Sequence, residues 1–404
     1  MAVVRPFRAL RPVPSVASAV ASVPYDVVNV AEARSLAAEL PLSFLHVTRP
    51  EIDLPDETDP YAAAVYERAR ANLASLREQA PLVVEDTPSL YVYRLRDGAH
   101  VQTGVAGCYS LDEYDAGVIK KHERTRPDKE DDRTRHMETL GAQTGVVFLT
   151  YRQQSAVDDL VARISRDEPL FDFTAPDGVQ HTVWRAPTPL TTALSAAFDA
   201  VPALYIADGH HRAASAARAR SAAAGDATSA GRDRFLAVAF PDHETRILAY
   251  NRTLSDLAGA TPEAFLKAVT ARLDVSPDAN PVPDRGHSAM YLAGRWYGVR
   301  LAPPASTDDA VGSLDVARLQ DQILGPLLDV VDIRTDPRVR FVGGIRGTAE
   351  LEQQVDGGAA AVAFSMAPVT VAELLAVADA GSIMPPKSTW FEPKLRDGLL
   401  THLF

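Results

Sequence analysis

Two adjacent histidines near the middle of the chain lie in a segment whose residue types suit phosphate binding. Residues 203–219 read ALYIADGHHRAASAARA, which predicts a strand over 203–207, a tight turn, and a helix from Arg212 onward. Such a turn directs unpaired backbone N–H groups and the positive end of a helix dipole at one point, and this arrangement favours an anion, above all a phosphate. The glycine of the turn allows close backbone approach or a positive φ.

Each polar side chain of this turn has a chemistry of its own. Arg212 can donate two hydrogen bonds to phosphate oxygens, and the two histidines can donate protons or bind metal. Asp208 could merely cap the helix, but capping does not explain two histidines and an arginine in a polar turn after an apolar strand. We therefore predict a phosphate-binding set of Gly209, His210, His211 and Arg212, with Asp208 as an acid that handles protons or binds Mg²⁺.

A second charged segment, 118–139, reads VIKKHERTRPDKEDDRTRHMET. Pro127 predicts that a helix begins there, after a strand and a loop. A solvated helix accounts for the later charges, but it accounts less well for the loop, which would present its side chains into a cleft. We predict Glu123 as a catalytic base with His122 beside it, and the following phosphate-binding cations: Lys120, Lys121, Arg124, Arg126, Lys129 and Arg133.

Lysine is rare in this chain, with six among 41 basic residues. Because arginine is the usual cation here, a lysine suggests a position that needs a compact, rotatable charge. Three of the six lie in 118–139 and two lie in 384–396, MPPKSTWFEPKLR. From this terminal segment we predict the substrate-binding residues Lys387, Ser388 and Thr389; a tail that only packs is an equal alternative.

Two polar residues interrupt apolar segments near the N-terminus and are further candidates for substrate binding. Asp26 lies in 23–28 and His46 lies in 42–48, and both segments have the length of short strands. The alternatives are a turn-forming aspartate and a buried core histidine.

The order of the expected elements predicts an α/β (α+β) protein with two domains. Residues 1–255 form an α/β domain that carries both charged motifs, with a hairpin expected from 235–240 and 245–251. Residues 256–404 form a smaller α+β domain whose ordered tail returns towards the site.

The composition limits the partners. A net charge of -12 argues against a binder of nucleic acid or anionic membranes. The single cysteine, Cys108, excludes an internal disulfide and a thiolate metal cage. No apolar run is long enough to span a membrane, so we expect a cytoplasmic protein that binds a small-molecule substrate and a phosphate donor. The oligomeric state is left open.

A phosphate-binding turn, a His–Glu pair and several cations favour phosphoryl transfer with Mg²⁺. Two alternatives stay open: a metal-dependent phosphohydrolase that uses His122, His210 and His211, and a non-catalytic sensor of a nucleotide or phosphorylated metabolite. The chain has neither a P-loop motif nor a G-x-S-x-G elbow.

Several longer motifs resemble those of the domain of unknown function 1015 family, over nearly the whole chain. They are RPFRALRP, VPYDV, LSFLHVTRPE, IKKHERTRPDKEDDR, YIADGHHR and MPPKSTWFEPKLR. The H-E segment and the DGHHR turn are also similar to free L-serine kinases of the ParB/sulfiredoxin-like fold. That resemblance implies Glu123 as the base for the serine hydroxyl, phosphates held by Gly209 to Arg212, and O-phosphoserine as product. It also implies a catalytic region elaborated with extra strands and helices, and it leaves ATP, ADP or pyrophosphate open as donor.

Overall fold

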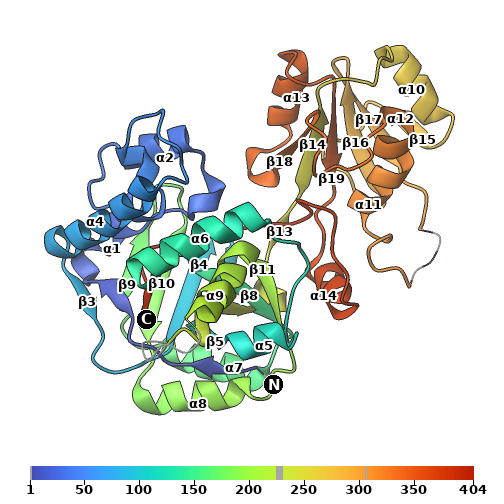
Figure 1. The fold of residues 1–404 in the computed structure, drawn as a ribbon. Helices are drawn as coiled ribbons and strands as arrows, with labels where there is room; N and C mark the ends of the chain where they lie inside the picture. The colour runs from blue at the N-terminus through green and yellow to red at the C-terminus, as the bar shows by residue number, and fades with distance from the viewer. Residues whose placement is uncertain (1, 224–230, 305, 307) are drawn as a thin grey trace. The chain divides into compact units, whose positions relative to one another are not determined.

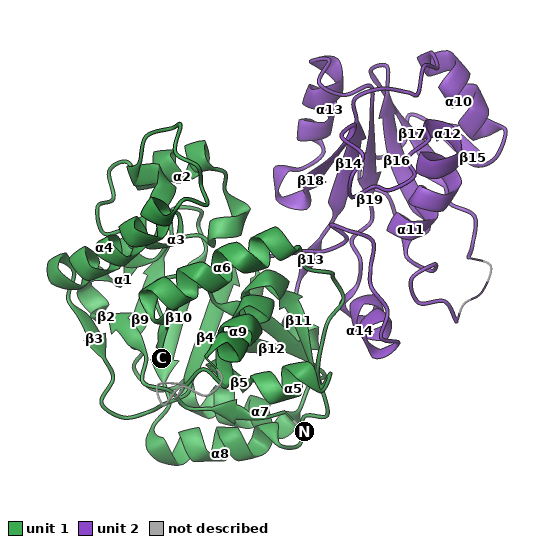
Figure 2. Cartoon of the chain, in the orientation of Figure 1, with its two compact units in different colours: residues 1–245, 393–404 green, residues 246–392 purple. Residues whose placement is uncertain are grey.

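The protein forms two compact units (Figure 2) in a computed structural model that describes residues 2–223, 231–304, 306 and 308–404. Unit 1 consists of Met1–Thr245 and Pro393–Phe404, and unit 2 is Arg246–Glu392. Unit 2 is therefore inserted into the sequence of unit 1. The domain boundary expected at residue 255 falls inside unit 2, and the terminal segment from Pro393 belongs to unit 1.

Within the described residues, unit 1 is built on a nine-stranded sheet (Figure 1). The strand order is β6-β11-β8-β12-β5-β4-β10-β9, and β1 pairs with β5. β8, β11 and β12 are buried almost throughout because apolar residues occupy both of their faces. The bounds are β1 Val4–Arg5, β4 Tyr91–Asp97, β5 His100–Ser110, β6 Ile119–Lys120, β8 Val147–Tyr151, β9 Phe171–Thr174, β10 Gln180–Arg185, β11 Leu204–Asp208 and β12 Arg234–Pro241.

Helices pack on this sheet and on one another, which confirms the expected mixed α/β class. α9 contacts β8 and β12, α6 packs on α9, and α4 packs on α6. α7 and α8 pack together, and α7 also contacts β5. The bounds are α4 Ala63–Gln79, α5 Leu111–Asp115, α6 Pro127–Leu140, α7 Ser155–Ile164, α8 Thr188–Phe198 and α9 His210–Ala222. α6 begins at Pro127, as the sequence predicts.

The strands expected at 23–28 and 42–48 are wrong. The first segment contains the 3-10 helix η2 (Tyr25–Val27), which follows Pro24. The second contains the helical turn α3 (Leu45–Thr48). Phe44 and Val47 lie three residues apart and share a buried cluster with α4, so the apolar spacing here is helical rather than alternating.

Unit 2 contains a six-stranded sheet with the order β15-β17-β16-β19-β14-β18 within the described residues. The expected hairpin of 235–240 with 245–251 does not form, because β12 pairs with β5 and β8 whereas β14 pairs with β18 and β19. The bounds are β14 Tyr250–Leu254, β15 Asp274–Pro277, β16 His287–Leu292, β17 Arg295–Arg300, β18 Val339–Gly343, β19 Val362–Met366, α10 Pro262–Thr270, α11 Asp315–Leu319, α12 Gly325–Leu328, α13 Ala349–Asp356 and α14 Val371–Asp379.

One short strand pair joins the two ends of the insertion within unit 2, and another holds the segment after the insertion within unit 1. In unit 2, β13 (Ile247–Leu248) pairs with β20 (Trp390–Phe391). In unit 1, β21 (His402–Leu403) pairs with β7 (Ala142–Gln143).

Candidate active site

The two charged motifs follow neighbouring parallel strands. β6 pairs with β11 in parallel, with Leu204 opposite Ile119 and Tyr205 opposite Lys120. Parallel neighbours end at the same edge of a sheet, and ligands of α/β proteins commonly bind outside that edge. The chain leaves β6 into the H-E segment and leaves β11 into the DGHHR turn, so the sheet itself brings these distant segments together.

Glu123 of the H-E segment lies beside His210 of the DGHHR turn. The carboxylate of Glu123 lies 3.9 Å from Nδ1 of His210. The Glu123 side chain is 36% exposed, whereas that of His210 is 4% exposed. Glu123 is thus accessible to a small molecule and lies beside a group that is fixed in the protein interior.

α9 begins at His210, two residues earlier than expected, so the histidines form its first turn. Gly209 precedes them with φ +93°, a conformation that favours glycine. A Cβ at this position would also lie 3.2 Å from Cζ of Arg212. The first N–H groups of α9 have no partner within the helix, so they can receive an oxyanion.

The backbone of the H-E segment fixes the tautomer of both histidines. The N–H of His122 donates to Nε2 of His210 at 3.4 Å, and the N–H of Arg126 donates to Nε2 of His211 at 3.0 Å. In the neutral ring the proton then lies on Nδ1. His210 therefore presents an N–H towards Glu123.

Burial keeps the central imidazoles neutral. It lowers the pKa of His122 to about 4, against small opposing effects from Ile206 and Asp208. Burial also lowers the pKa of His210 well below its usual value, and the nearby His122 adds to this effect. The two rings meet edge to face, with centroids 4.5 Å apart. Near neutral pH, His122 and His210 are therefore neutral hydrogen-bonding groups in a fixed orientation and not cations.

Arg212 lies beneath the turn and is almost completely buried, with 3% of its side chain exposed. One terminal nitrogen donates to the carbonyl of Val146, and the other donates to both carboxylate oxygens of Asp26 at 3.0 and 3.1 Å. Asp208 lies 3.7 Å from the same guanidinium. Burial alone would lower the pKa of Arg212, but the surrounding carboxylates raise it above its usual value. Nε of Arg212 is buried without a hydrogen-bond partner. The predicted contact of Arg212 with phosphate stays a prediction.

Two residues of the terminal segment complete this charge cluster, and they were not predicted as site residues. Lys394 donates to Asp208 at 3.1 Å. Burial alone would raise the pKa of Asp208, but Lys394 and Arg212 together hold it below its usual value. Asp397 accepts from the N–H of Val146 at 3.4 Å, and its other oxygen is buried without a hydrogen-bond partner. The scarcity of lysine pointed to the right segment and could have identified Lys394.

Several of the predicted phosphate-binding cations contact aromatic rings instead. The Lys121 ammonium lies 3.6 Å from the ring centroid of Tyr114, and that of Lys120 lies 5.9 Å from the ring centroid of Tyr205. Lys129 donates to the hydroxyl of Tyr61 at 3.0 Å. Their phosphate roles stay predictions.

The predicted arginines of the H-E segment differ in exposure. Arg133 is half-buried, donates to Asp132 at 2.8 Å and stacks over Tyr25 at 4.4 Å, so its contacts hold α6 against η2. Arg126 is exposed and pairs with Asp128 at 2.8 Å, and Arg124 is exposed. Arg124 and Arg126 are therefore the more accessible candidates.

Comparison with known families identifies the chain. The model of DUF1015, described as a protein of unknown function, matches residues 4–317. The chain belongs to the DUF1015 family. A comparison with curated proteins found no match.

Three solved structures of other proteins are distantly similar to this chain. A conserved hypothetical protein from Pyrococcus furiosus has 13% identity and a TM-score of 0.34, covering 73% of this chain and 93% of its own. A free serine kinase in complex with AMP has 13% identity and a TM-score of 0.35, covering 71% and 86%. SbnI with a C-terminal truncation, from Staphylococcus aureus, has 12% identity and a TM-score of 0.39, covering 73% and 86%. At these scores the likeness carries no argument about activity, which rests on the residues of this chain.

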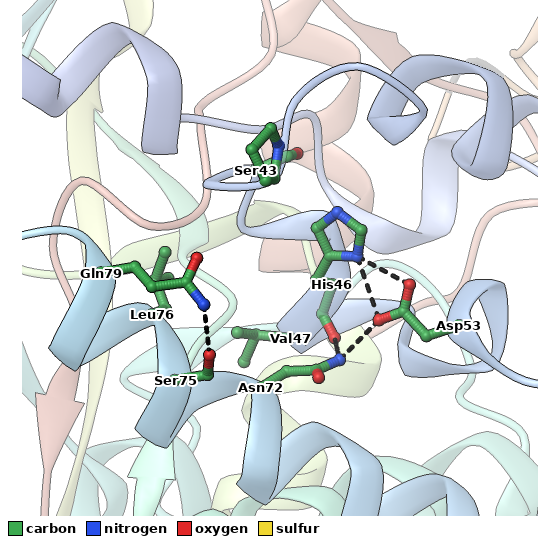
Figure 3. A pocket seen from close by; sticks show the side chains of 9 residues that line it. Ser43, His46, Val47, Asp53, Asn72, Ser75, Leu76 and Gln79 are labelled. Atoms are coloured by element: carbon green, nitrogen blue, oxygen red, sulfur yellow. Dashed lines mark hydrogen bonds and ion pairs between the residues drawn. The ribbon is translucent and has the colours of Figure 1, made fainter.

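His46 lines a separate cavity of about 220 Å³ in unit 1 of this DUF1015 protein (Figure 3). Its Nδ1 lies 2.9 and 3.0 Å from the two carboxylate oxygens of Asp53, and this hydrogen bond raises the pKa of His46. Asn72 donates to the same carboxylate at 2.7 Å. None of the residues that line the cavity belongs to 118–139 or 203–219, so this cavity does not join His46 to the H-E and DGHHR motifs. The lining residues are Pro41, Ser43, His46, Val47, Asp53, Asn72, Ser75, Leu76 and Gln79.

The other candidates for substrate binding are divided between the units. Asp26 lies in the charge cluster of unit 1, paired with Arg212. Lys387, Ser388 and Thr389 belong to unit 2. Ser388 is buried and donates to the carbonyl of Pro385 at 2.6 Å. Substrate binding by these residues stays a prediction.

The residues of the site do not fit a magnesium ion held by the protein alone. Asp208 already has Lys394 and Arg212 beside its carboxylate. Over the ranges that the structure describes, no group of three or more His, Cys, Asp or Glu side chains could hold a metal ion. His210 and His211 also accept hydrogen bonds from backbone N–H groups with their Nε2 lone pairs, which disfavours the zinc alternative.

In the described part of the chain, no helix combines the length and apolar character needed to cross a bilayer.

Proposed function

We propose that this protein is a phosphotransferase that transfers a phosphoryl group to the hydroxyl of a small substrate, free L-serine in the simplest case. The observation that carries the proposal is the position of Glu123, which is accessible, lies 3.9 Å from His210 and is adjacent to the first turn of α9. An accessible carboxylate next to an anion-receiving helix end is what transfer to a hydroxyl requires.

In the proposed reaction Glu123 accepts the proton of the substrate hydroxyl. The hydroxyl oxygen forms a bond to the terminal phosphorus while the bond from that phosphorus to the leaving phosphate breaks. The N–H groups of the first turn of α9 receive the phosphate oxygens. Gly209 supplies the positive φ from which α9 begins, and Arg212 and Lys394 fix the carboxylate of Asp208.

Serine as acceptor, and ATP, ADP or pyrophosphate as donor, are parts of the proposal. Mg²⁺ belongs to it only as the counter-ion that accompanies the donor phosphates and enters with the substrate. The protein residues then supply the base, the hydrogen bonds and the positioning.

The test is incubation of the protein with Mg²⁺, L-serine and each donor in turn, with detection of O-phosphoserine by mass. Replacing Glu123 with Gln keeps the shape of the side chain and removes the base, so turnover is expected to fall by about 10²- to 10⁴-fold. Glu138→Gln is the matched control, since Glu138 is an exposed carboxylate on α6, and its turnover should be unchanged.

Two results would contradict the proposal. The first is near-normal turnover in the Glu123→Gln variant. The second is a rise in melting temperature with a donor but no product from any donor, which would favour the sensor alternative.

A further inference from the structure

Arg252 is the largest fully buried side chain of the described residues, with 0% exposed. It lies on β14 of unit 2, opposite Phe341 of β18 and Phe364 of β19. Neither the proposed phosphoryl transfer nor the sequence motifs give it a role.

The partners of Arg252 are all neutral. Its two terminal nitrogens donate to the carbonyls of Tyr250 and Lys387, the latter at 3.4 Å. The guanidinium carbon lies 5.5 Å from the ring centroid of Phe341. Its Nε is buried without a hydrogen-bond partner. Burial lowers the pKa of Arg252 to about 10, and no carboxylate of the described residues opposes this effect.

A buried cation without a counter-charge is unfavourable, because the charge loses its hydration and nothing of opposite sign replaces it. Carbonyl groups and an aromatic ring offset this cost only in part. The surroundings of Arg252 therefore lack one component, which is a negative charge.

The segment next to Arg252 brings a second cation and reaches the surface. Lys387 is exposed, has φ +53°, and points its carbonyl at Arg252. Its ammonium lies 5.7 Å from the ring centroid of Tyr250. A positive φ is uncommon for lysine and marks a backbone held in place by its surroundings. The long contact from Arg252 to this carbonyl is one that a better acceptor could replace.

We infer that Arg252 and Lys387 form a binding site in unit 2 for an oxyanion, the carboxylate or phosphate group of a small ligand. Nε and a terminal nitrogen of a guanidinium form a fork that accepts two oxygens. The carbonyl of Lys387 is displaced, and the Lys387 ammonium adds a second positive charge. This site does not depend on the chemistry assigned to Glu123.

Hydrogen exchange of the full chain tests the inference at the segment itself, peptide 385–391. The probes are inorganic phosphate and L-serine, with ethanolamine as a control that keeps the amine and hydroxyl but lacks the carboxylate. We expect slower exchange of 385–391 with at least one oxyanion and no change with ethanolamine. Protection by phosphate alone or by serine alone identifies which group the site takes.

Arg252→Met removes the fork and keeps an apolar side chain, so the anion concentration for half-maximal protection should rise by about tenfold or more. Arg295→Met is the matched control, because Arg295 is an exposed arginine of the same unit that pairs with Asp278. Glu123→Gln should retain the protection, which separates this site from the proposed catalytic one.

The inference is wrong if neither oxyanion slows exchange at millimolar concentration, or if Arg252→Met is protected as well as Arg295→Met. If Arg252→Met does not fold, Lys387→Gly decides the question. That variant keeps Arg252, removes the ammonium and tolerates the positive φ, so unchanged protection in it would overturn the site.

Discussion

Arg212 of unit 1 and Arg252 of unit 2 are both buried, and their surroundings are opposite. Arg212 in unit 1 lies among carboxylates, with Asp26 at 3.0 Å and Asp208 at 3.7 Å. Arg252 in unit 2 has carbonyls and an aromatic ring around it. The pKa of Arg212 is raised by its carboxylate neighbours, whereas burial lowers that of Arg252 to about 10.

This difference separates two uses of the same residue type. A paired, buried guanidinium connects segments and holds them in one geometry, as Arg212 does for η2, β11 and the first turn of α9. A buried guanidinium without a carboxylate beside it, such as that of Arg252, carries a positive charge that the described residues do not neutralise. The first is therefore expected to matter for stability and the second for binding.

The strongest test exchanges each arginine for Met. Arg212→Met leaves Asp26 and Asp208 without their shared partner, and we expect a loss of about 3–5 kcal/mol in the free energy of unfolding. Arg252→Met should be neutral or stabilising, because it removes an uncompensated charge. Urea unfolding measures both, and equal losses for the two variants would remove the distinction.

Asp397 sharpens the comparison through pH. Burial raises its pKa to about 7, Arg212 opposes the shift and Asp26 adds to it. A carboxyl whose pKa is raised on folding stabilises the protein fully below its unfolded pKa, and this contribution is lost as pH rises towards 7. Asp397→Asn cannot ionise, so it should be more stable than the wild type at pH 8 by up to roughly 4 kcal/mol. Parallel stability–pH curves for the two proteins between pH 4 and pH 8 would contradict this.

Gly209 tests how closely Arg212 packs beneath the turn. Gly209→Ala places a Cβ 3.2 Å from the guanidinium and forces alanine to φ +93°, which together should cost about 1–3 kcal/mol. Gly178→Ala is the control, because it has φ +84° with nothing within 4 Å. The difference between the two variants in thermal unfolding isolates the contact with Arg212, and no difference would mean that the contact relaxes freely.

Lys394 gives the smallest expected effect. Lys394→Met removes the strongest of the charges that lower the pKa of Asp208, so the acid limb of the rate–pH profile should move to higher pH and kcat/KM should fall about tenfold in the proposed reaction. Lys267→Met is the control, since Lys267 is an exposed lysine on α10. An unchanged acid limb would show that Asp208 does not depend on Lys394.

The convergence of the two motifs could be predicted from the sequence because each follows a short apolar strand and begins a helix. Those local signals also gave Pro127 as the start of α6. The sequence predicted a helix that starts at Arg212 rather than at His210. The residue pattern does not show that Gly209 adopts a positive φ, and this conformation lets α9 begin directly after it.

Long-range partners could not be read from local pattern. Arg133 was predicted to bind phosphate, but local pattern could not show its contacts with Tyr25 and Asp132, which depend on how α6 packs. Residues 384–396 read as one segment, yet the chain passes from unit 2 to unit 1 within it. This crossing places Lys394 in unit 1, where it donates to Asp208.

The insertion of unit 2 determines the order in which a ribosome delivers the parts of the molecule. A nascent chain that has reached Glu392 contains the whole of unit 2, including both strands of the β13–β20 pair. It also contains both charged motifs, but not Lys394, Asp397 or strand β21. Unit 2 can thus finish folding first. The charge cluster of unit 1 can form only after the segment from Pro393 has been translated.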